Sequence, residues 1–278
     1  IAWYNNMSNG SFGDQSIISD NSTGVSVGVG DINSDGDPDV VYHSEPSDEI
    51  VWKENNIPSG EPFGMERVVS SVNTNPNSIS TSDVDSDGRK DVVASFSGTT
   101  GNRKIVWYRN MGGGSFGTEN IVSDNINGPT DIKVIDIDND NYKDIISSVR
   151  FDDEIRVFFN DGCGAFPENE LVDTNSDGFH SLHSKDITGD GLPDIVAAAL
   201  FDDEVTWYEN EGNRSFSNAK TVAENIGQPV DVHLTDFNND NKLDIISASD
   251  GGINDAKIFW YEQSESFGNI SFSSPKII

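Results

Sequence analysis

The stretch DIDNDNYKD, residues 136–144, decides the fold of this chain of 278 residues. Its acidic side chains alternate with other residues, and short apolar runs flank it, Ile132 to Val134 before it and Ile145 to Ile146 after it. Four more stretches repeat the pattern at intervals of 50 to 53 residues: DINSDGDPD (31–39), DVDSDGRKD (83–91), DITGDGLPD (186–194) and DFNNDNKLD (236–244). Self-similarity at this period indicates a repeat protein in which every repeat gathers several oxygen-bearing side chains in one loop.

Each repeat also contains four short apolar runs, separated by Gly, Asn, Asp and Ser. The first two flank the acidic loop, the third is aromatic, and the fourth begins at a phenylalanine after a Gly/Asn-rich turn. All five tryptophans occupy the third run: Trp3, Trp52, Trp107, Trp207 and Trp260. Such runs predict antiparallel strands, and no window has the apolar spacing of a helix. We therefore predict an all-β chain, a β-propeller of four-stranded antiparallel blades, over an open β-solenoid with its usually shorter rungs.

The phase of the repeat predicts one propeller over residues 1–278, with five complete blades and an N-terminal half blade. The half blade covers residues 1–20, and the complete blades cover approximately 24–72, 77–124, 129–174, 180–224 and 229–278. Either the ring closes on the half blade, or the chain is a segment of a longer protein. We expect a segment, because the sequence starts at Ile1 in mid-blade with no initiator methionine or signal peptide.

The acidic loops have the ligand chemistry of calcium. Oxygen ligands at alternating positions suit Ca²⁺, which accepts six to eight of them, better than Mg²⁺ or Zn²⁺. Positions one, three, five and nine offer side-chain oxygens, position seven offers a carbonyl, and the Gly or Asn at position six tolerates left-handed backbone. The predicted ligands are Asp31, Asn33, Asp35, Asp37 and Asp39; Asp83, Asp85, Asp87, Arg89 and Asp91; Asp136, Asp138, Asp140, Tyr142 and Asp144; Asp186, Thr188, Asp190, Leu192 and Asp194; and Asp236, Asn238, Asp240, Lys242 and Asp244.

We expect up to five structural Ca²⁺ ions, with weaker binding in the loops at 186–194 and 236–244, which carry three carboxylates each. An EF-hand would need glutamate at position twelve, where the chain has Tyr42, Ala94, Ser147, Ala197 and Ser247. An acidic hairpin turn without metal is the remaining alternative for a single loop. Because the acidic pattern recurs in register in five loops, we favour metal binding over a turn without metal.

Composition excludes several classes of protein. The formal net charge of −31 repels nucleic acid and anionic membranes, so we expect neither as a partner. The longest apolar stretch, residues 195–201, is too short to span a bilayer. Cys163 is the only cysteine, which rules out a disulfide within the chain, and its Gly-rich surroundings indicate a turn.

The motifs WYRN (107–110), GGGSFG (112–117), DIDND (136–140) and DII (144–146) resemble the FG-GAP/VCBS-type repeat, which is related to the propeller of integrin α subunits. The resemblance covers nearly the whole chain. Phe166 is followed by Pro167 and Phe216 by Ser217, so we expect altered outer edges in the third and fourth complete blades. The family implies an extracellular, calcium-stabilised propeller used in adhesion, in recognition of glycans or proteins, or as an accessory domain.

The sequence contains no His-Glu-x-x-His motif and no phosphate loop. We interpret the acidic pairs at 151–154 and 201–204 as structural turns, and we expect His180 and His183 to point to opposite faces of a strand. The leading hypothesis is a non-catalytic, extracellular or cell-surface module for adhesion, recognition or assembly, with a protein or glycan ligand at the cell surface or in the matrix, or with neighbouring domains. The alternative is a carbohydrate-active propeller, a lectin or a polysaccharide lyase.

Overall fold

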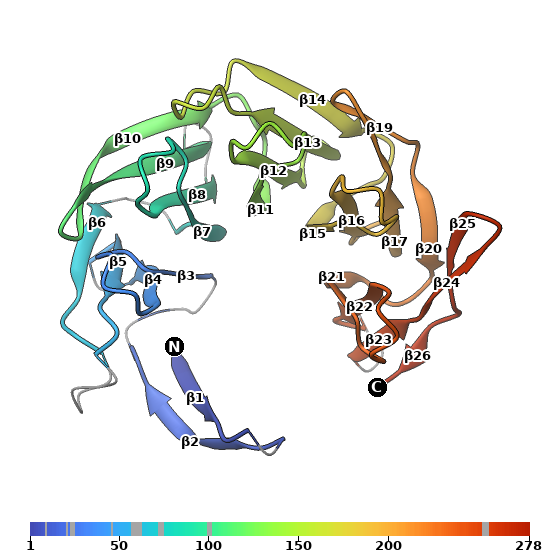
Figure 1. Ribbon diagram of the computed structural model, residues 1–278, viewed down its shortest axis with the longest axis horizontal. Coiled ribbons are helices and arrows are strands. Elements are labelled where there is room, and N and C mark those ends of the chain that lie inside the picture. Colours follow the sequence, from blue (N-terminus) through green and yellow to red (C-terminus); the bar gives the residue numbers. More distant parts are fainter. Residues whose placement is uncertain are drawn as a thin grey trace.

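The computed structural model describes residues 1–8, 10–20, 22, 26–45, 47–56, 63–71, 75–98, 102–251 and 256–278. All regular secondary structure in these residues is β-strand. Figure 1 shows the sheets arranged radially around a common centre, which confirms the predicted all-β propeller. The expected limits of the first complete blade, residues 24 and 72, lie outside the described residues. None of the described segments forms an apolar helix long enough to cross a membrane.

Five four-stranded antiparallel sheets form the blades. Blade 1 contains β3 (Val27–Gly30), β4 (Asp39–Ser44), β5 (Glu49–Lys53) and β6 (Arg67–Ser71). Blade 2 contains β7 (Ser78–Ser82), β8 (Asp91–Ser97), β9 (Arg103–Gly112) and β10 (Ser115–Ser123). Blade 3 contains β11 (Pro129–Ile135), β12 (Asp144–Val149), β13 (Glu154–Phe159) and β14 (Glu168–Asp173).

Blade 4 contains β15 (Phe179–Lys185), β16 (Asp194–Ala199), β17 (Glu204–Tyr208) and β20 (Lys220–Glu224). Blade 5 contains β21 (Pro229–Thr235), β22 (Asp244–Ser249), β23 (Lys257–Tyr261) and β26 (Lys276–Ile277). Both blades also carry a small separate hairpin between the third and fourth strands. These hairpins are β18 (Asn210–Gly212) with β19 (Ser215–Phe216), and β24 (Gln263–Ser266) with β25 (Asn269–Phe272).

The outer edges differ between blades, as expected for blades 3 and 4. In blade 3 the fourth strand starts only after Pro167, because proline has no N–H to donate to a neighbouring strand. In blade 4 the pairing breaks after Phe216 and resumes at Lys220. Blade 5 has the longest extra hairpin, and the sequence analysis did not anticipate it.

Another two-stranded sheet precedes blade 1. Its strands are β1 (Ala2–Asn6) and β2 (Phe12–Ile17). Trp3 and Ile18 pack on Val40 and Tyr42 of blade 1, and Lys53 Nζ donates a hydrogen bond of 2.6 Å to the Ile18 carbonyl. In Figure 1 this hairpin lies on one side of an opening in the ring and blade 5 lies on the other.

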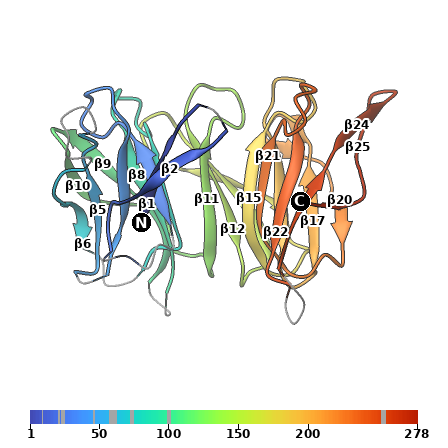
Figure 2. The same ribbon diagram turned by 90° about the horizontal axis from the view of Figure 1, so that it is seen from below.

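The apolar core lies between neighbouring blades, because alternate side chains of a strand point to opposite faces of its sheet. In β8, Val92 and Ala94 face blade 1, whereas Val93 faces blade 3. Blades 2, 3 and 4 therefore bury both faces of their sheets against neighbouring blades. Figure 2 shows the strands running from one face of the disc to the other, so the loop between the first and second strands always falls on the same face.

A tryptophan hydrogen bond links two pairs of successive blades. Trp52 Nε1 donates to the Gly114 carbonyl of blade 2 at 3.0 Å, and Trp107 Nε1 donates to the Gly164 carbonyl of blade 3 at 3.0 Å. Gly164 has φ of +81°, and a Cβ atom there would lie 2.3 Å from the Trp107 ring. Only glycine allows the turn to approach the indole so closely.

We predict that Gly164→Ala costs more stability than Gly113→Ala. Gly113 also has positive φ, +61°, but an added Cβ would have no atom within 4 Å. Both variants should lose about 1 kcal/mol through left-handed backbone. Gly164→Ala should lose a further ~1–3 kcal/mol through overlap with Trp107. Chemical denaturation of both variants measures the difference, and equal losses would contradict the role assigned to this contact.

Candidate metal centres

The five acidic loops connect the first and second strands of the five blades. Position six of every loop has left-handed backbone, with φ of 95° at Gly36, 87° at Gly88, 74° at Asn141, 93° at Gly191 and 67° at Asn241. This confirms the sequence-based expectation for that position. Position four is left-handed as well, at Ser34, Ser86, Asn139, Gly189 and Asn239. Two left-handed residues curl each loop tightly around its acidic side chains.

Backbone amides fix the first and fifth side chains of each loop. The two carboxylate oxygens of Asp136 accept hydrogen bonds from Asp140 N at 3.0 Å and Asn141 N at 2.9 Å. Asp140 Oδ1 in turn accepts a hydrogen bond from Tyr142 N at 2.8 Å. The same three bonds occur in the loops beginning at Asp31, Asp83, Asp186 and Asp236. The loops are therefore one structure repeated five times.

The ninth residue of each loop, Asp39, Asp91, Asp144, Asp194 or Asp244, is fully buried. Asp144 accepts hydrogen bonds from Ile137 N at 3.0 Å, in its own loop, and from Asn160 N at 2.9 Å, next to the end of the third strand. Burial raises the pKa of Asp144 to about 7 and those of Asp91 and Asp194 to about 6, while these backbone bonds oppose the shift. A buried carboxylate of this kind is stable in its ionised form only beside a positive charge.

Two loops bring three carboxylates together. One oxygen from each of Asp83, Asp85 and Asp91 lies within 4.8 Å of the others, and Asp136, Asp138 and Asp144 form the same arrangement in blade 3. Among the described residues these are the two such clusters. The other three loops have Asn33, Thr188 or Asn238 at position three, so one carboxylate is missing there.

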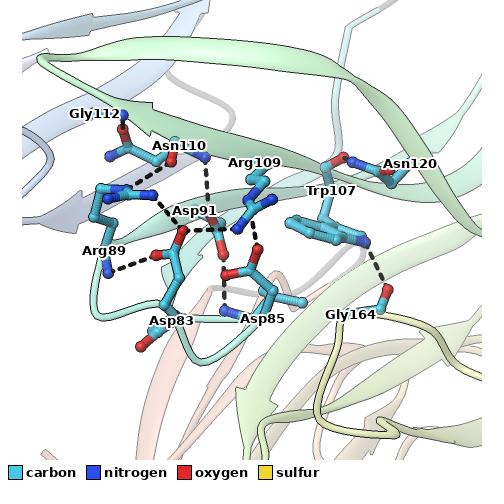
Figure 3. A network of polar contacts seen from close by, with 12 residues as sticks. Asp83, Asp85, Arg89, Asp91, Trp107, Arg109, Asn110, Gly112, Asn120 and Gly164 are labelled. Atoms are coloured by element: carbon cyan, nitrogen blue, oxygen red, sulfur yellow. Dashed lines mark hydrogen bonds and ion pairs between the residues drawn. The ribbon is translucent and has the colours of Figure 1, made fainter.

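The cluster in blade 2 fits a divalent cation. Figure 3 shows Asp83, Asp85 and Asp91 in this loop, and one carboxylate oxygen of each lies within 4.8 Å of the others. Asp85 Oδ1 is buried and has no hydrogen-bond partner, although the other oxygen of this carboxylate is paired. A buried oxygen without a partner is costly, and coordination to a hard cation would satisfy it. Asp83, Asp85 and Asp91 would supply three of its oxygen ligands.

Arginines that the sequence analysis did not single out neutralise the outer side of both clusters. Arg109 Nε lies 2.6 Å from Asp85 Oδ2, and Arg109 Nη2 lies 3.1 Å from Asp87 Oδ2 (Figure 3). Arg214 Nε of blade 4 lies 2.8 Å from Asp138 Oδ2 in the loop of blade 3. The only sequence signal for these residues was their position near the aromatic run.

Buried amide side chains couple each loop to the preceding one. Asn160 Nδ2 donates to the Val84 carbonyl of the blade 2 loop at 2.7 Å and to the Lys143 carbonyl of its own loop at 2.9 Å. Asn110 and Asn210 make the same pair of bonds, and Gln263 Nε2 donates to the Ile187 carbonyl at 3.1 Å. The sequence analysis noted one of these asparagines only as part of the WYRN motif.

A cavity of about 290 Å³ lies between blades 4 and 5. There the long hairpin β24–β25 takes the place of a short glycine turn, and Trp207, unlike Trp52 and Trp107, makes no indole hydrogen bond within the described residues. Lys220 Nζ lies 4.2 Å from the Trp207 ring centroid and pairs with Glu209. The cavity is lined by Thr188, Trp207, Glu209, Lys220, Glu265, Gly268, Asn269 and Ile270.

The remaining residues singled out in the sequence have structural contacts. The acidic hairpins are turns whose carboxylates accept backbone hydrogen bonds: Asp152 from Asn127 N at 2.9 Å, and Asp202 from Asp177 N at 2.7 Å. Cys163 is exposed in a turn, as expected.

His180 and His183 both contact β21, through the Val230 carbonyl at 2.9 Å and the His233 ring at 4.3 Å. The expectation that the two rings point to opposite faces is wrong: both face β21, because the register shifts between Phe179 and Ser181 and alternation is broken at His180. Burial, followed by the neighbouring His233, lowers the pKa of His183 to about 3. Both rings serve contacts between blades 4 and 5, which leaves them poorly placed to act as a ligand pair.

Comparisons with solved structures give the same fold. The chain is similar to the BP39L lectin from Burkholderia pseudomallei, with a TM-score of 0.62 and 14% identity over 91% of this chain and 69% of that chain. A lectin from Agrocybe aegerita, described as specifically recognising non-reducing terminal N-acetylglucosamine, gives 0.60 and 20% over 90% of this chain and 64% of that one. A mutant of AofleA from Arthrobotrys oligospora gives 0.59 and 12% over 97% and 77%.

The chain therefore spans 64% of the length of the Agrocybe lectin. At these identities the likeness establishes the propeller fold. A comparison with curated proteins gave no match. The family model for the FG-GAP-like repeat matches residues 1–42, 83–147, 136–197 and 186–247, each segment containing at least one acidic loop. Because these segments cover more than half of the sequence, the chain belongs to the FG-GAP-like repeat family.

Proposed function

We propose that this chain is an extracellular, calcium-stabilised propeller that acts as a non-catalytic recognition module with a glycan ligand. The observation that carries the recognition part is the cavity beside Trp207, where the indole has no acceptor among the described residues and hydrogen-bonding groups surround it. The observation that carries the calcium part is the pair of three-carboxylate clusters.

The calcium proposal rests on electrostatics. Three carboxylates within 4.8 Å repel one another unless a cation or protons neutralise them, and the adjacent arginines reach only the outer oxygens. Oxygen sites of this kind in extracellular modules bind Ca²⁺ with dissociation constants of about 10⁻⁴ to 10⁻³ M. Such affinities suit the calcium concentration outside cells, which supports an extracellular location.

The glycan proposal rests on the chemistry of the cavity. The Trp207 indole, the Glu209 and Glu265 carboxylates and the Asn269 amide surround a volume of about 290 Å³. Trp207 is 3% exposed and Lys220 lies over its ring, so the cavity offers mainly hydrogen-bond donors and acceptors, which match the hydroxyl groups around the edge of a sugar ring. Ligand sites generally combine apolar walls with a few placed polar groups. The lectins among the similar folds support the same class of ligand.

We predict that calcium raises the melting temperature by several degrees or more, because an ion bound only to the folded state stabilises it by about 2.7 kcal/mol at 100 times its dissociation constant. Asp85→Asn should lose part of this gain, since it removes a carboxylate from the blade 2 cluster. Asp14→Asn, an exposed change in β2, is the matched control and should keep the full gain. Calorimetry with calcium, magnesium or chelator makes the measurement, and equal gains in both variants would contradict this assignment.

We predict that the calcium-dependent gain is larger at pH 8 than at pH 5. In chelator, the folded-state pKa of Asp144, about 7, exceeds its unfolded value of about 3.9. The folded chain therefore binds more protons than the unfolded chain between those values, so its free energy of unfolding falls as pH rises. Calcium binding instead needs ionised carboxylates and weakens in acid. Melting curves at both pH values test this, and a larger gain at pH 5 would contradict it.

We predict that Lys220→Ala weakens glycan binding at least about tenfold, the loss of roughly 1.4 kcal/mol. Lys276→Ala is the matched control, because Lys276 lies 4.2 Å above Trp260 and pairs with Glu262 in the same way, but outside the cavity. A glycan array that includes terminal N-acetylglucosamine identifies the ligand, and titration calorimetry compares the variants.

A turnover assay on acidic polysaccharides accompanies the array. Saturable binding without product supports the recognition module. Release of product would show a polysaccharide lyase, and the absence of any glycan binding would refute this ligand class. Either result leaves the calcium proposal to be judged by its own measurements.

A further inference from the structure

The junction between blades 3 and 4 differs from the preceding one at two positions that face each other. At the junction of blades 2 and 3, Trp107 donates to the Gly164 carbonyl, and a Cβ atom at Gly164 would lie 2.3 Å from the indole. At the junction of blades 3 and 4 the tryptophan position holds Val157, and the glycine position, in the turn between β18 and β19, holds Arg214. A side chain fits at this turn position because the indole is missing.

Arg214 keeps the left-handed backbone of the glycines that hold this position in blades 2 and 3. Its φ is +62°, and its neighbour Asn213 has φ of +54°. Left-handed backbone is unfavourable for a residue with a Cβ atom, although asparagine tolerates it better than most. Arginine is therefore a costly choice here, and strained backbone persists where other contacts compensate for it.

The Arg214 side chain makes such contacts with the acidic loop of blade 3. Its Nε lies 2.8 Å from Asp138 Oδ2, and its Nη1 lies 2.5 Å from Glu168 Oε2. The guanidinium carbon lies 4.3 Å from the centroid of the Phe159 ring, within the range of a cation–π contact. Two carboxylates and an aromatic ring thus hold the guanidinium beside the three-carboxylate cluster of blade 3.

Blade 2 places a guanidinium at the same point by a different route. Phe159 and Arg109 occupy equivalent positions, each directly before the asparagine that links two loops. Arg109 Nε lies 2.6 Å from Oδ2 of Asp85, the position-three aspartate of its loop, as Asp138 is in blade 3 (Figure 3). Where phenylalanine replaces this arginine, blade 4 supplies the guanidinium instead. Two independent placements of the same group indicate that these two loops need it.

The other three loops show the opposite combination. Glutamate occupies the position of Arg109, and position three of the loop has no carboxylate; the pairs are Glu54 with Asn33, Glu209 with Thr188, and Glu262 with Asn238. Asn33 Nδ2 donates to Glu54 Oε1 at 3.1 Å, and Asn238 Nδ2 donates to Glu262 Oε1 at 3.2 Å. Arginine therefore accompanies the loops that carry the extra carboxylate, and glutamate accompanies the loops that lack it.

We propose that Arg109 and Arg214 are built-in counter-ions, which keep the acidic loops of blades 2 and 3 ordered without calcium and lower their affinity for it. The guanidinium pairs with one oxygen of the position-three carboxylate and leaves the other, as Asp85 Oδ1 is left without a partner. A calcium ion bound at that second oxygen is repelled by the nearby guanidinium. Ranking the loops by carboxylate count alone therefore overstates the affinity of blades 2 and 3. The effect on affinity rests on the calcium part of the proposed function, whereas the counter-ion role does not.

Arg214→Gly tests the proposal, because it restores the glycine of blades 2 and 3 and removes the backbone strain. Asn213→Gly is the matched control, since it relieves left-handed backbone in the same turn without a change of charge. In chelator, Arg214→Gly should melt at least about 2 °C below Asn213→Gly. In calcium titrations one binding step should tighten about tenfold in Arg214→Gly and stay at the wild-type value in the control. Arg109→Gln makes the equivalent test in blade 2.

The two measurements judge the two parts of the proposal separately. An Arg214→Gly variant that melts at or above Asn213→Gly in chelator would overturn the counter-ion role. Calcium binding that is unchanged or weaker in this variant would overturn the effect on affinity. A wild type without any calcium response would instead refute the calcium part of the proposed function, and the melting curves in chelator would still decide the counter-ion role.

Discussion

The structure depends on the buried aspartate that ends each acidic loop. Asp144 is fully buried and accepts one backbone hydrogen bond from its own loop and one from the residue next to the end of the third strand. It therefore joins the loop to the second and third strands of its blade. An ionised carboxylate in such a position is costly unless a positive charge accompanies it. The acidic loops therefore do more than connect strands, because each ends in a buried carboxylate that needs a nearby positive charge.

The loops are also linked to one another around the ring. The Asn160 amide reaches the carbonyl of Val84 in the preceding loop as well as a carbonyl of its own loop, and both bonds are buried or nearly so. Loss of order in one loop would leave a buried amide of the next blade without its acceptor, at a cost of about 1–3 kcal/mol. The order of one acidic loop is thus coupled to packing in the next blade, which explains why an acidic loop and a blade junction recur together.

Sequence patterns predicted the features that depend on residues close together in the chain and missed the contacts between blades. Strand alternation and the spacing of Asp136, Asp138 and Asp140 identified the fold, because apolar period and loop chemistry are local properties. Asn160 and Arg214 were missed, because their partners lie in another blade. The cavity beside Trp207 could not be predicted either. It depends on how far hairpin β24–β25 stands from an indole that is distant in sequence.

The tryptophan position shows how one repeat can serve two purposes. Where a glycine turn meets the indole, at Trp52 and Trp107, the contact closes the junction and leaves no space. At Trp207 the turn is replaced by a longer hairpin, the hydrogen bond is lost, and a cavity opens. Four apolar residues of blade 4 stay buried, namely Ile187, Val196, Val205 and Trp207. The junction between blades 4 and 5 therefore keeps its packing while a cavity forms at its rim. One junction of such a propeller can therefore open a cavity at its rim without loss of the core that holds the ring.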